Sequence, residues 1–313
     1  MKKVIFLMMF ICFISPQEVC MGGIPFRRET LNNAVLIKNS FGKFGTGVIV
    51  AQKTNSGHKV FLMTNKHVLE NDEKELCDYI TVGFYLKQRL QNRPAVKPIK
   101  IMCKENGQKS TRLFYHPTEG VDVAGILISD LTRAHTDIAW SVLEDDLLLN
   151  KEIMKKEVIE VGEDVLVLGY PAGIFSRNNY LPVGKQGVIA SVPYEELTVE
   201  IGGQMFTGKI ILVDATLFGG SSGGPVFIKP RWKATKNEET GQQTMQIGEG
   251  LPPYLLGIQS SAIEIKEKVY LPASQEEDSI AKETSELAIE KDEDGEFFKL
   301  TKPIMLNLVF SAD

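Results

Sequence analysis

Short apolar runs, most of them rich in β-branched residues, recur along the chain between polar or glycine-containing turns. This spacing predicts an all-β fold of the sandwich or barrel type, because alternating strands and helices would place longer helical patterns between the runs. Only 145–156 and 279–289 carry a weak helical period. The predicted strands are 34–37, 46–50, 60–63, 79–86, 123–128, 165–170, 187–192, 210–216 and 254–263.

Polar stretches divide this pattern. The charged segment 149–163 is the expected joint between two β units, one over 30–150 and the other over 160–313. Within the second unit, 229–250 is polar and predicts a surface loop, and 266–296 predicts a second polar insert.

The N-terminus has the layout of a secretory signal peptide. Lys2 and Lys3 precede an apolar run at 4–14, which is too short to span a bilayer, since a span takes about twenty residues. We therefore expect a signal peptide over about 1–20, no membrane span, and export to the periplasm or the extracellular space. A lipid anchor at Cys20 is disfavoured, because the preceding residues lack the Leu-x-small pattern of bacterial lipoprotein signals.

Composition narrows the function classes. The 313 residues are 43% hydrophobic and 24% charged, as in an ordinary globular protein, and a net charge of −5 argues against nucleic-acid binding. Ten acidic residues against two lysines at 276–296 predict a solvated or disordered insert. Cys77 and Cys103 fit either a disulfide or two free thiols. No Cys/His spacing suggests a metal site, and we expect no cofactor.

The sequence Gly-Gly-Ser-Ser-Gly-Gly-Pro-Val at 219–226 is the strongest chemical signal. Acyl transfer needs an exposed hydroxyl on a tight turn, with backbone N–H groups aimed where negative charge develops. Glycines on both sides of a serine permit such a turn. A flexible loop is the alternative interpretation of the same residues.

A serine nucleophile needs a base, and the chain has four histidines. His67 follows an apolar strand at the start of a short polar turn, where an imidazole can face a cleft. His58 and His135 lie in polar, turn-like surroundings, and His116 precedes a proline in a predicted loop. His67 is therefore the candidate base.

Two aspartates are candidates for the carboxylate that orients this base. Asp122 and Asp137 both have the form Asp-(Val/Ile)-Ala and lead into an apolar run. A carboxylate at such a half-buried strand start is costly unless it is hydrogen-bonded. Holding a histidine is one reason for the position, and capping a turn is the other.

Together these motifs resemble those of the trypsin-like serine peptidases, in particular bacterial members related to the high-temperature-requirement type. The chain carries Thr-x-x-His-Val-Leu, His-Pro followed by Val-Asp-Val-Ala, and Gly-x-Ser-Gly-Gly-Pro-Val in that order. The stretches 162–173 and 181–190 resemble two further strands of the family. The resemblance covers about 30–263.

The resemblance implies two six-stranded antiparallel β-barrels over 30–150 and 160–313, with the active site between them. It makes Ser222 the nucleophile, His67 the general base, and Asp122 rather than Asp137 the orienting carboxylate. The backbone N–H groups of Gly220 and Ser222 would form the oxyanion hole. The implied function is a serine endopeptidase that acts on proteins or peptides.

The resemblance also implies a substrate pocket, and the chain departs from the family elsewhere. Thr216 would lie at the floor of the primary pocket, and the absence of an acid there argues against strict preference for Lys or Arg. Ser221 replaces the aspartate that digestive members pair with a freed N-terminus, so activation by that route is not expected. The other implied pocket residues are Leu217, Gly257, Ile258, Gln259 and Ser260.

Two other functions compete with the peptidase. One is a catalytically inert, trypsin-like binding protein, against which the intact set of histidine, aspartate and serine argues. The other is an esterase, because Gly220-Ser-Ser222-Gly-Gly224 formally matches G-x-S-x-G. That motif belongs between a strand and a helix, whereas here a proline and a predicted strand follow.

Overall fold

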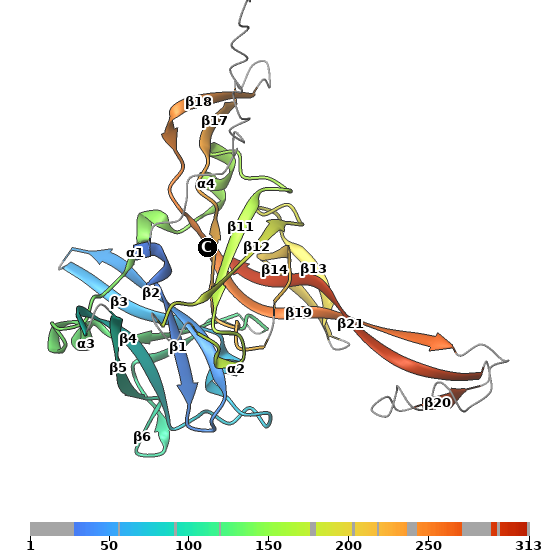
Figure 1. Cartoon of the computed structure of the whole chain (residues 1–313), viewed down its shortest axis with the longest axis horizontal. Helices are drawn as coiled ribbons and strands as arrows, with labels where there is room; N and C mark the ends of the chain where they lie inside the picture. The colour runs from blue at the N-terminus through green and yellow to red at the C-terminus, as the bar shows by residue number, and fades with distance from the viewer. Residues whose placement is uncertain are drawn as a thin grey trace, which may run out of the picture.

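The computed structural model describes residues 28–311 except 56, 91–92, 119, 176–179, 202–203, 218, 237–242, 271–288 and 293–294. Two curled, largely antiparallel sheets dominate these residues, the first in the N-terminal half and the second in the C-terminal half (Figure 1). The predicted all-β fold of two barrels is therefore confirmed. The predicted signal peptide lies outside the described residues.

The first sheet has the strand order β5-β4-β1-β2-β3-β9-β8, and β10 adds a short parallel pairing to β2. It therefore holds more strands than the six expected. Its strands are β1 (Ala34–Asn39), β2 (Phe44–Thr54), β3 (Gly57–Thr64), β4 (Tyr79–Leu90), β5 (Arg93–Met102), β8 (Leu113–Tyr115), β9 (Ala124–Leu127) and β10 (Leu143–Glu144).

The second sheet has the order β15-β12-β11-β16-β19-β21-β20, and β15 also pairs with β21. That extra pairing closes six strands into a ring, the number expected, and leaves β20 outside it. Its strands are β11 (Asp164–Gly169), β12 (Val183–Ile189), β15 (Ile210–Ala215), β16 (Pro225–Ile228), β19 (Leu255–Tyr270), β20 (Ile289–Asp292) and β21 (Gly295–Ser311).

Short hairpins and helices complete the fold. In Figure 1, β19 and β21 continue beyond the sheet as a two-stranded arm, and β17 and β18 form a separate hairpin. The hairpin strands are β6 (Lys104–Glu105), β7 (Gln108–Lys109), β13 (Leu197–Ile201), β14 (Gln204–Gly208), β17 (Trp232–Lys236) and β18 (Gln243–Gly250). The helices are α1 (Arg28–Leu31), α2 (Lys66–Leu69), α3 (Ser129–Ala134), α4 (Lys151–Lys156), and the 3₁₀ turns η1 (Asp145–Leu147) and η2 (Pro171–Gly173).

Several sequence predictions can be compared with these elements. The weak helical period at 145–156 corresponds to η1 and α4. The surface loop expected at 229–250 is wrong, because β17 and β18 pair there in a hairpin. The second predicted helix, 279–289, lies almost wholly outside the described residues. Cys77 and Cys103 are both buried and are free thiols.

Apolar side chains gather in three places, one inside each sheet and one between them. The first sheet contributes side chains to two of these clusters, because successive side chains of a strand point to opposite faces. Strand β1 shows this alternation. Val35 and Ile37 face the interior of the first barrel, whereas Ala34 faces the second barrel. Because both faces are buried, the strand is apolar at successive positions.

The cluster between the sheets joins the two barrels, and we call it the seam. Its buried members from the first sheet are Ala34, Val48, Val50 and Leu143, and those from the second half are Leu168, Tyr170, Phe227, Leu255 and Ile258. Burial of these side chains stabilises one relative placement of the two sheets.

Truncation of the seam should destabilise the protein. Phe227 is fully buried, so Phe227→Ala removes most of a large side chain from a packed region and should lower the free energy of unfolding by about 3–5 kcal/mol. Phe114, which is 49% exposed, is the matched control, and Phe114→Ala should change the free energy of unfolding by about 0.5 kcal/mol or less. Urea denaturation measures both, and equal losses would contradict the proposed role of the seam.

Candidate active site

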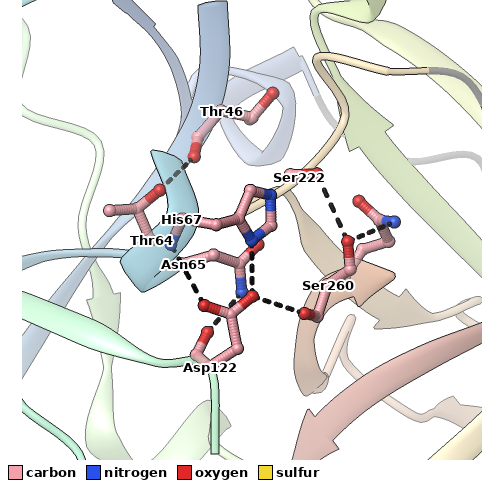
Figure 2. Close-up of polar contacts among 8 residues, drawn as sticks. Thr46, Thr64, Asn65, His67, Asp122, Ser222 and Ser260 are labelled. Atoms are coloured by element: carbon pink, nitrogen blue, oxygen red, sulfur yellow. Dashed lines mark hydrogen bonds and ion pairs between the residues drawn. The ribbon is translucent and has the colours of Figure 1, made fainter. Parts of the chain in front are cut away.

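The candidate site lies where three turns from the two barrels meet (Figure 2). His67 belongs to α2, which begins two residues after β3 ends. Asp122 lies two residues before β9, the neighbour of β3 in the sheet. Ser222 lies in the turn that leads into β16 of the second sheet. Adjacent strand ends thus place the first two residues, and the seam sets the position of the third.

His67 and Asp122 are in direct contact. His67 Nδ1 lies 2.5 Å from Asp122 Oδ2, and the backbone N–H of His67 donates to Asp122 Oδ1 at 3.2 Å. The side chain of Asn65 donates to the backbone carbonyl of Asp122 at 2.7 Å, and Ser260 Oγ donates to Asp122 Oδ2 at 2.7 Å. The carboxylate is therefore hydrogen-bonded on both oxygens, as its half-buried position requires.

These contacts also set the charge state of Asp122. Burial by itself raises the pKa of the carboxyl. The hydrogen bonds and charge of His67, together with the hydroxyl of Ser260, lower the pKa by more than burial raises it. The net result is a pKa below the ordinary aspartate value. The group is thus ionised at neutral pH and able to hold a proton on His67 Nδ1.

The other candidates lie elsewhere. Asp137 pairs with Lys97 at 2.9 Å, and its side chain is 52% exposed. His135 Nδ1 lies 3.3 Å from the same lysine amine, and His58 lies 3.4 Å from Glu144. His116 Nδ1 accepts from the backbone N–H of Thr118, at 3.2 Å. The structure therefore brings Asp122, and not Asp137, to a histidine at the junction of the barrels.

Ser222 lies on the side of the imidazole away from Asp122 (Figure 2). Its hydroxyl donates to the backbone carbonyl of Ser260 at 3.2 Å, and its own carbonyl accepts from the N–H of Thr46 at 2.8 Å. The side chain therefore points to the second barrel's β19, and a rotation about one bond redirects the hydroxyl.

The turn around Ser222 requires its glycines. Gly220 and Gly223 have φ values of 93° and 81°, in the left-handed region that favours glycine. A Cβ on Gly223 would lie 2.1 Å from the carbonyl oxygen of Thr46, and one on Gly224 would lie 2.1 Å from that of Leu168. Side chains at these positions would push the turn away from both barrels.

Several backbone N–H groups of this turn donate to no group among the described residues. They include those of Gly220 and Ser222, the pair that the resemblance assigns to the oxyanion hole. The adjacent carbonyls are held instead: the oxygen of Gly219 accepts from Ala172 N at 2.7 Å, and that of Gly220 accepts from Thr46 Oγ1 at 2.8 Å. A substrate oxygen that gains negative charge is the kind of acceptor such a pair of donors stabilises.

The residues implied as substrate-binding lie in different environments. Thr216 is exposed, and Leu217 packs against the core of the second barrel. Gly257 is buried, and Ile258 packs into the seam. Gln259 is buried, with its amide nitrogen 3.1 Å from the carbonyl oxygen of Ser260.

Sequence reasoning missed several residues of this network. Ser260 is predicted to contact substrate, and the structure adds a contact that was not predicted: its hydroxyl binds Asp122. Asn65 and Thr46 were not singled out, because one side-chain hydroxyl or amide beside a strand carries no recognisable pattern. Among the residues that the structure describes, no group of three or more His, Cys, Asp or Glu side chains is arranged to hold a metal ion.

Acid should weaken the protein through Asp122. Its folded-state pKa lies below the unfolded value of about 3.9, so its contribution to stability is present above that pH and is lost as pH falls through the folded pKa. In urea denaturation at pH 3 to 5, the free energy of unfolding should therefore fall less steeply with falling pH in Asp122→Asn than in wild type.

Asp137→Asn is the matched control, because its exposed ion pair is screened by water. It should follow the wild-type slope closely. Parallel curves for wild type and Asp122→Asn would contradict the ionic role of Asp122.

The solved structures that are similar to the chain include the Rv3671c protease from M. tuberculosis in its active form, at 18% identity, a TM-score of 0.41, and coverage of 90% of this chain and 77% of that one. The inactive form of the Rv3671c protease is 17% identical, with a TM-score of 0.39 and coverage of 90% of this chain and 85% of that one. Human heparin binding protein is 11% identical, with a TM-score of 0.39 and coverage of 77% of this chain and 85% of that one.

A search of curated protein sequences found no match. No helix among the described residues is long and apolar enough to cross a membrane. The family model described as a trypsin-like peptidase domain, however, matches residues 45–234, which include His67, Asp122 and Ser222. The chain therefore belongs to the family of trypsin-like peptidase domains.

Proposed function

We propose that the chain is an exported serine endopeptidase that cleaves proteins or peptides through an acyl-enzyme. The observation that carries this proposal is the contact of His67 Nδ1 with the ionised Asp122, in a site that also holds Ser222 and the N–H groups of Gly220 and Ser222, which have no acceptor among the described residues. Export is supported by Lys2, Lys3 and the apolar run at 4–14, and by no structural observation.

The reaction follows from these groups. His67 Nε2 takes the proton of Ser222 Oγ as that oxygen attacks the scissile carbonyl, and Asp122 stabilises the imidazolium that forms. The N–H groups of Gly220 and Ser222 bind the oxyanion. His67 then donates the proton to the leaving amine, and a water molecule hydrolyses the acyl-enzyme by the same path.

One observation favours the inert binding protein as the second candidate. The hydroxyl of Ser222 donates to Ser260 O instead of to a ring nitrogen of His67. Rotation about the Cα–Cβ bond redirects the hydroxyl, and nucleophile–base hydrogen bonds are often long or poorly aligned before substrate binds. We therefore favour the peptidase.

A fluorophosphonate probe tests the nucleophile directly, because it reacts with an activated serine hydroxyl. Wild type should be labelled on Ser222, and Ser222→Ala should not be labelled. His67→Ala and Asp122→Asn should be labelled on the order of 10³–10⁴ times more slowly, since each removes part of the activating relay. Peptide mass spectrometry of the labelled site measures all four proteins.

Asp137→Asn is the matched control for Asp122→Asn and should be labelled at the wild-type rate within about twofold. A folded wild-type protein that is not labelled would overturn the peptidase. Equal loss in the two aspartate variants would remove Asp122 from its proposed role.

We also propose a primary pocket that accepts small or apolar side chains. The resemblance places Thr216 at its floor, where no carboxylate would pair with a basic side chain, and the neighbouring Leu217 is apolar. Profiling with a peptide library should therefore show cleavage after small or apolar residues. Strong preference for Arg at that position would contradict the assignment of this pocket.

A further inference from the structure

Thr46 reaches from β2 of the first barrel into the turn that holds Ser222. It is fully buried, and its backbone N–H donates to Ser222 O at 2.8 Å. Its hydroxyl donates to Gly220 O at 2.8 Å and accepts from the N–H of Tyr170 at 3.0 Å. Its own carbonyl accepts from Thr64 Oγ1 at 2.7 Å (Figure 2). One buried threonine thus contacts the candidate nucleophile and the residue two positions before it.

The Gly219–Gly220 peptide is the part of this turn that rotates most easily, because neither glycine carries a Cβ. In a trans peptide the carbonyl of Gly219 and the N–H of Gly220 point in opposite directions. A flip of this peptide would therefore withdraw the Gly220 donor from the proposed oxyanion hole and turn a carbonyl oxygen toward it. Catalysis requires that the peptide be held in one orientation.

One hydrogen bond holds this peptide directly, and a second holds the next peptide along the turn. Ala172 N donates to Gly219 O at 2.7 Å, and Thr46 Oγ1 donates at 2.8 Å to Gly220 O, which belongs to the Gly220–Ser221 peptide. Ala172 has φ 50° and ψ 27°, a left-handed conformation that is unfavourable for a residue with a Cβ and persists only where its surroundings impose it. The turn that carries it begins at Tyr170, whose N–H binds the same threonine hydroxyl.

The hydroxyl of Thr46 is therefore linked to both peptides that flank Gly220. It binds the carbonyl of the Gly220–Ser221 peptide directly, and it binds the N–H of Tyr170, at the strand end from which the Ala172 turn starts. Both of its hydrogen-bonding functions are used, since a hydroxyl supplies one donor and accepts through its lone pairs.

The geometry points to Thr46 as a positioning residue of the oxyanion hole, whose side-chain hydroxyl restrains Gly220: it holds the Gly220–Ser221 peptide directly, and the Gly219–Gly220 peptide through the turn from Tyr170 to Ala172. This inference rests on the proposed peptidase function. Because the Gly220 donor acts on charge that develops in the transition state, loss of its orientation lowers kcat and leaves substrate binding nearly unchanged.

Thr46→Val isolates the hydroxyl. Valine keeps the shape of the side chain but leaves the N–H of Tyr170 and the carbonyl of Gly220 without their partner, which favours rearrangement of the turn. The backbone contact from residue 46 to Ser222 O is retained. Thr46→Ser is the complementary variant, because it restores the hydroxyl and lacks only the methyl group.

Steady-state kinetics on a fluorogenic peptide selected by the library profile measure the effect. Thr46→Val should lower kcat about 10–100-fold, less than or comparable to the loss of one oxyanion-hole donor, with KM within about twofold of wild type. Thr46→Ser should recover kcat to within about threefold. Thr132→Val removes a threonine hydroxyl that donates to Ser129 O at 2.8 Å in α3, outside the site, and should leave both constants unchanged.

A wild-type kcat in Thr46→Val would overturn the inference, and so would equal losses in Thr46→Val and Thr46→Ser, which would assign the effect to the methyl group. A crystal structure of Thr46→Val gives a readout that needs no activity. At least one of the two peptides that flank Gly220 should change orientation there, and two unchanged peptides would also overturn the inference. An inactive wild type would overturn the proposed function alone.

Discussion

The seam between the two barrels fixes the distances in the candidate site, because His67 and Asp122 belong to one sheet and Ser222 to the other. Each barrel has its own apolar core, so neither core by itself sets where the other barrel lies. Buried side chains such as Val48 and Phe227 hold the two sheets against each other, and Thr46 adds directional hydrogen bonds at the end of that contact. Burial of apolar side chains stabilises the contact between the barrels, and the directional hydrogen bonds fix their relative position at the site.

The contacts of Asp122 show how the site stabilises a largely buried negative charge. Desolvation disfavours a carboxylate there, yet its two oxygens receive three hydrogen bonds, from the ring and backbone of His67 and from Ser260. The third of these comes from the second barrel. The ionised state that His67 needs is therefore maintained partly by the same inter-barrel contact that positions Ser222.

Much of this arrangement follows from sequence. Continuous apolar runs such as those of β1 and β2 arise because both faces of those strands are buried, and the glycines around Ser222 are required by φ values and close approaches that can be inferred from the motif. The β17–β18 hairpin was not predicted, because a two-stranded ribbon with polar residues lacks the apolar signal that marks a core strand. Ser260 and Thr46 were not assigned these roles either, since their partners lie 138 and 174 residues away and depend on how the barrels pack.

Ser221 and Thr46 together explain how the oxyanion turn is held without a charged pair. Ser221 is 3% exposed, so an aspartate in its place would be a buried charge that needs a cation to offset its desolvation. A neutral serine has no such requirement, and it also provides no ionic anchor for the turn. The anchoring then falls to neutral hydrogen bonds from Ala172 and Thr46, of which the second crosses the barrel interface. Because that bond exists only when the barrels are packed, formation of the proposed oxyanion hole is coupled to packing of the seam.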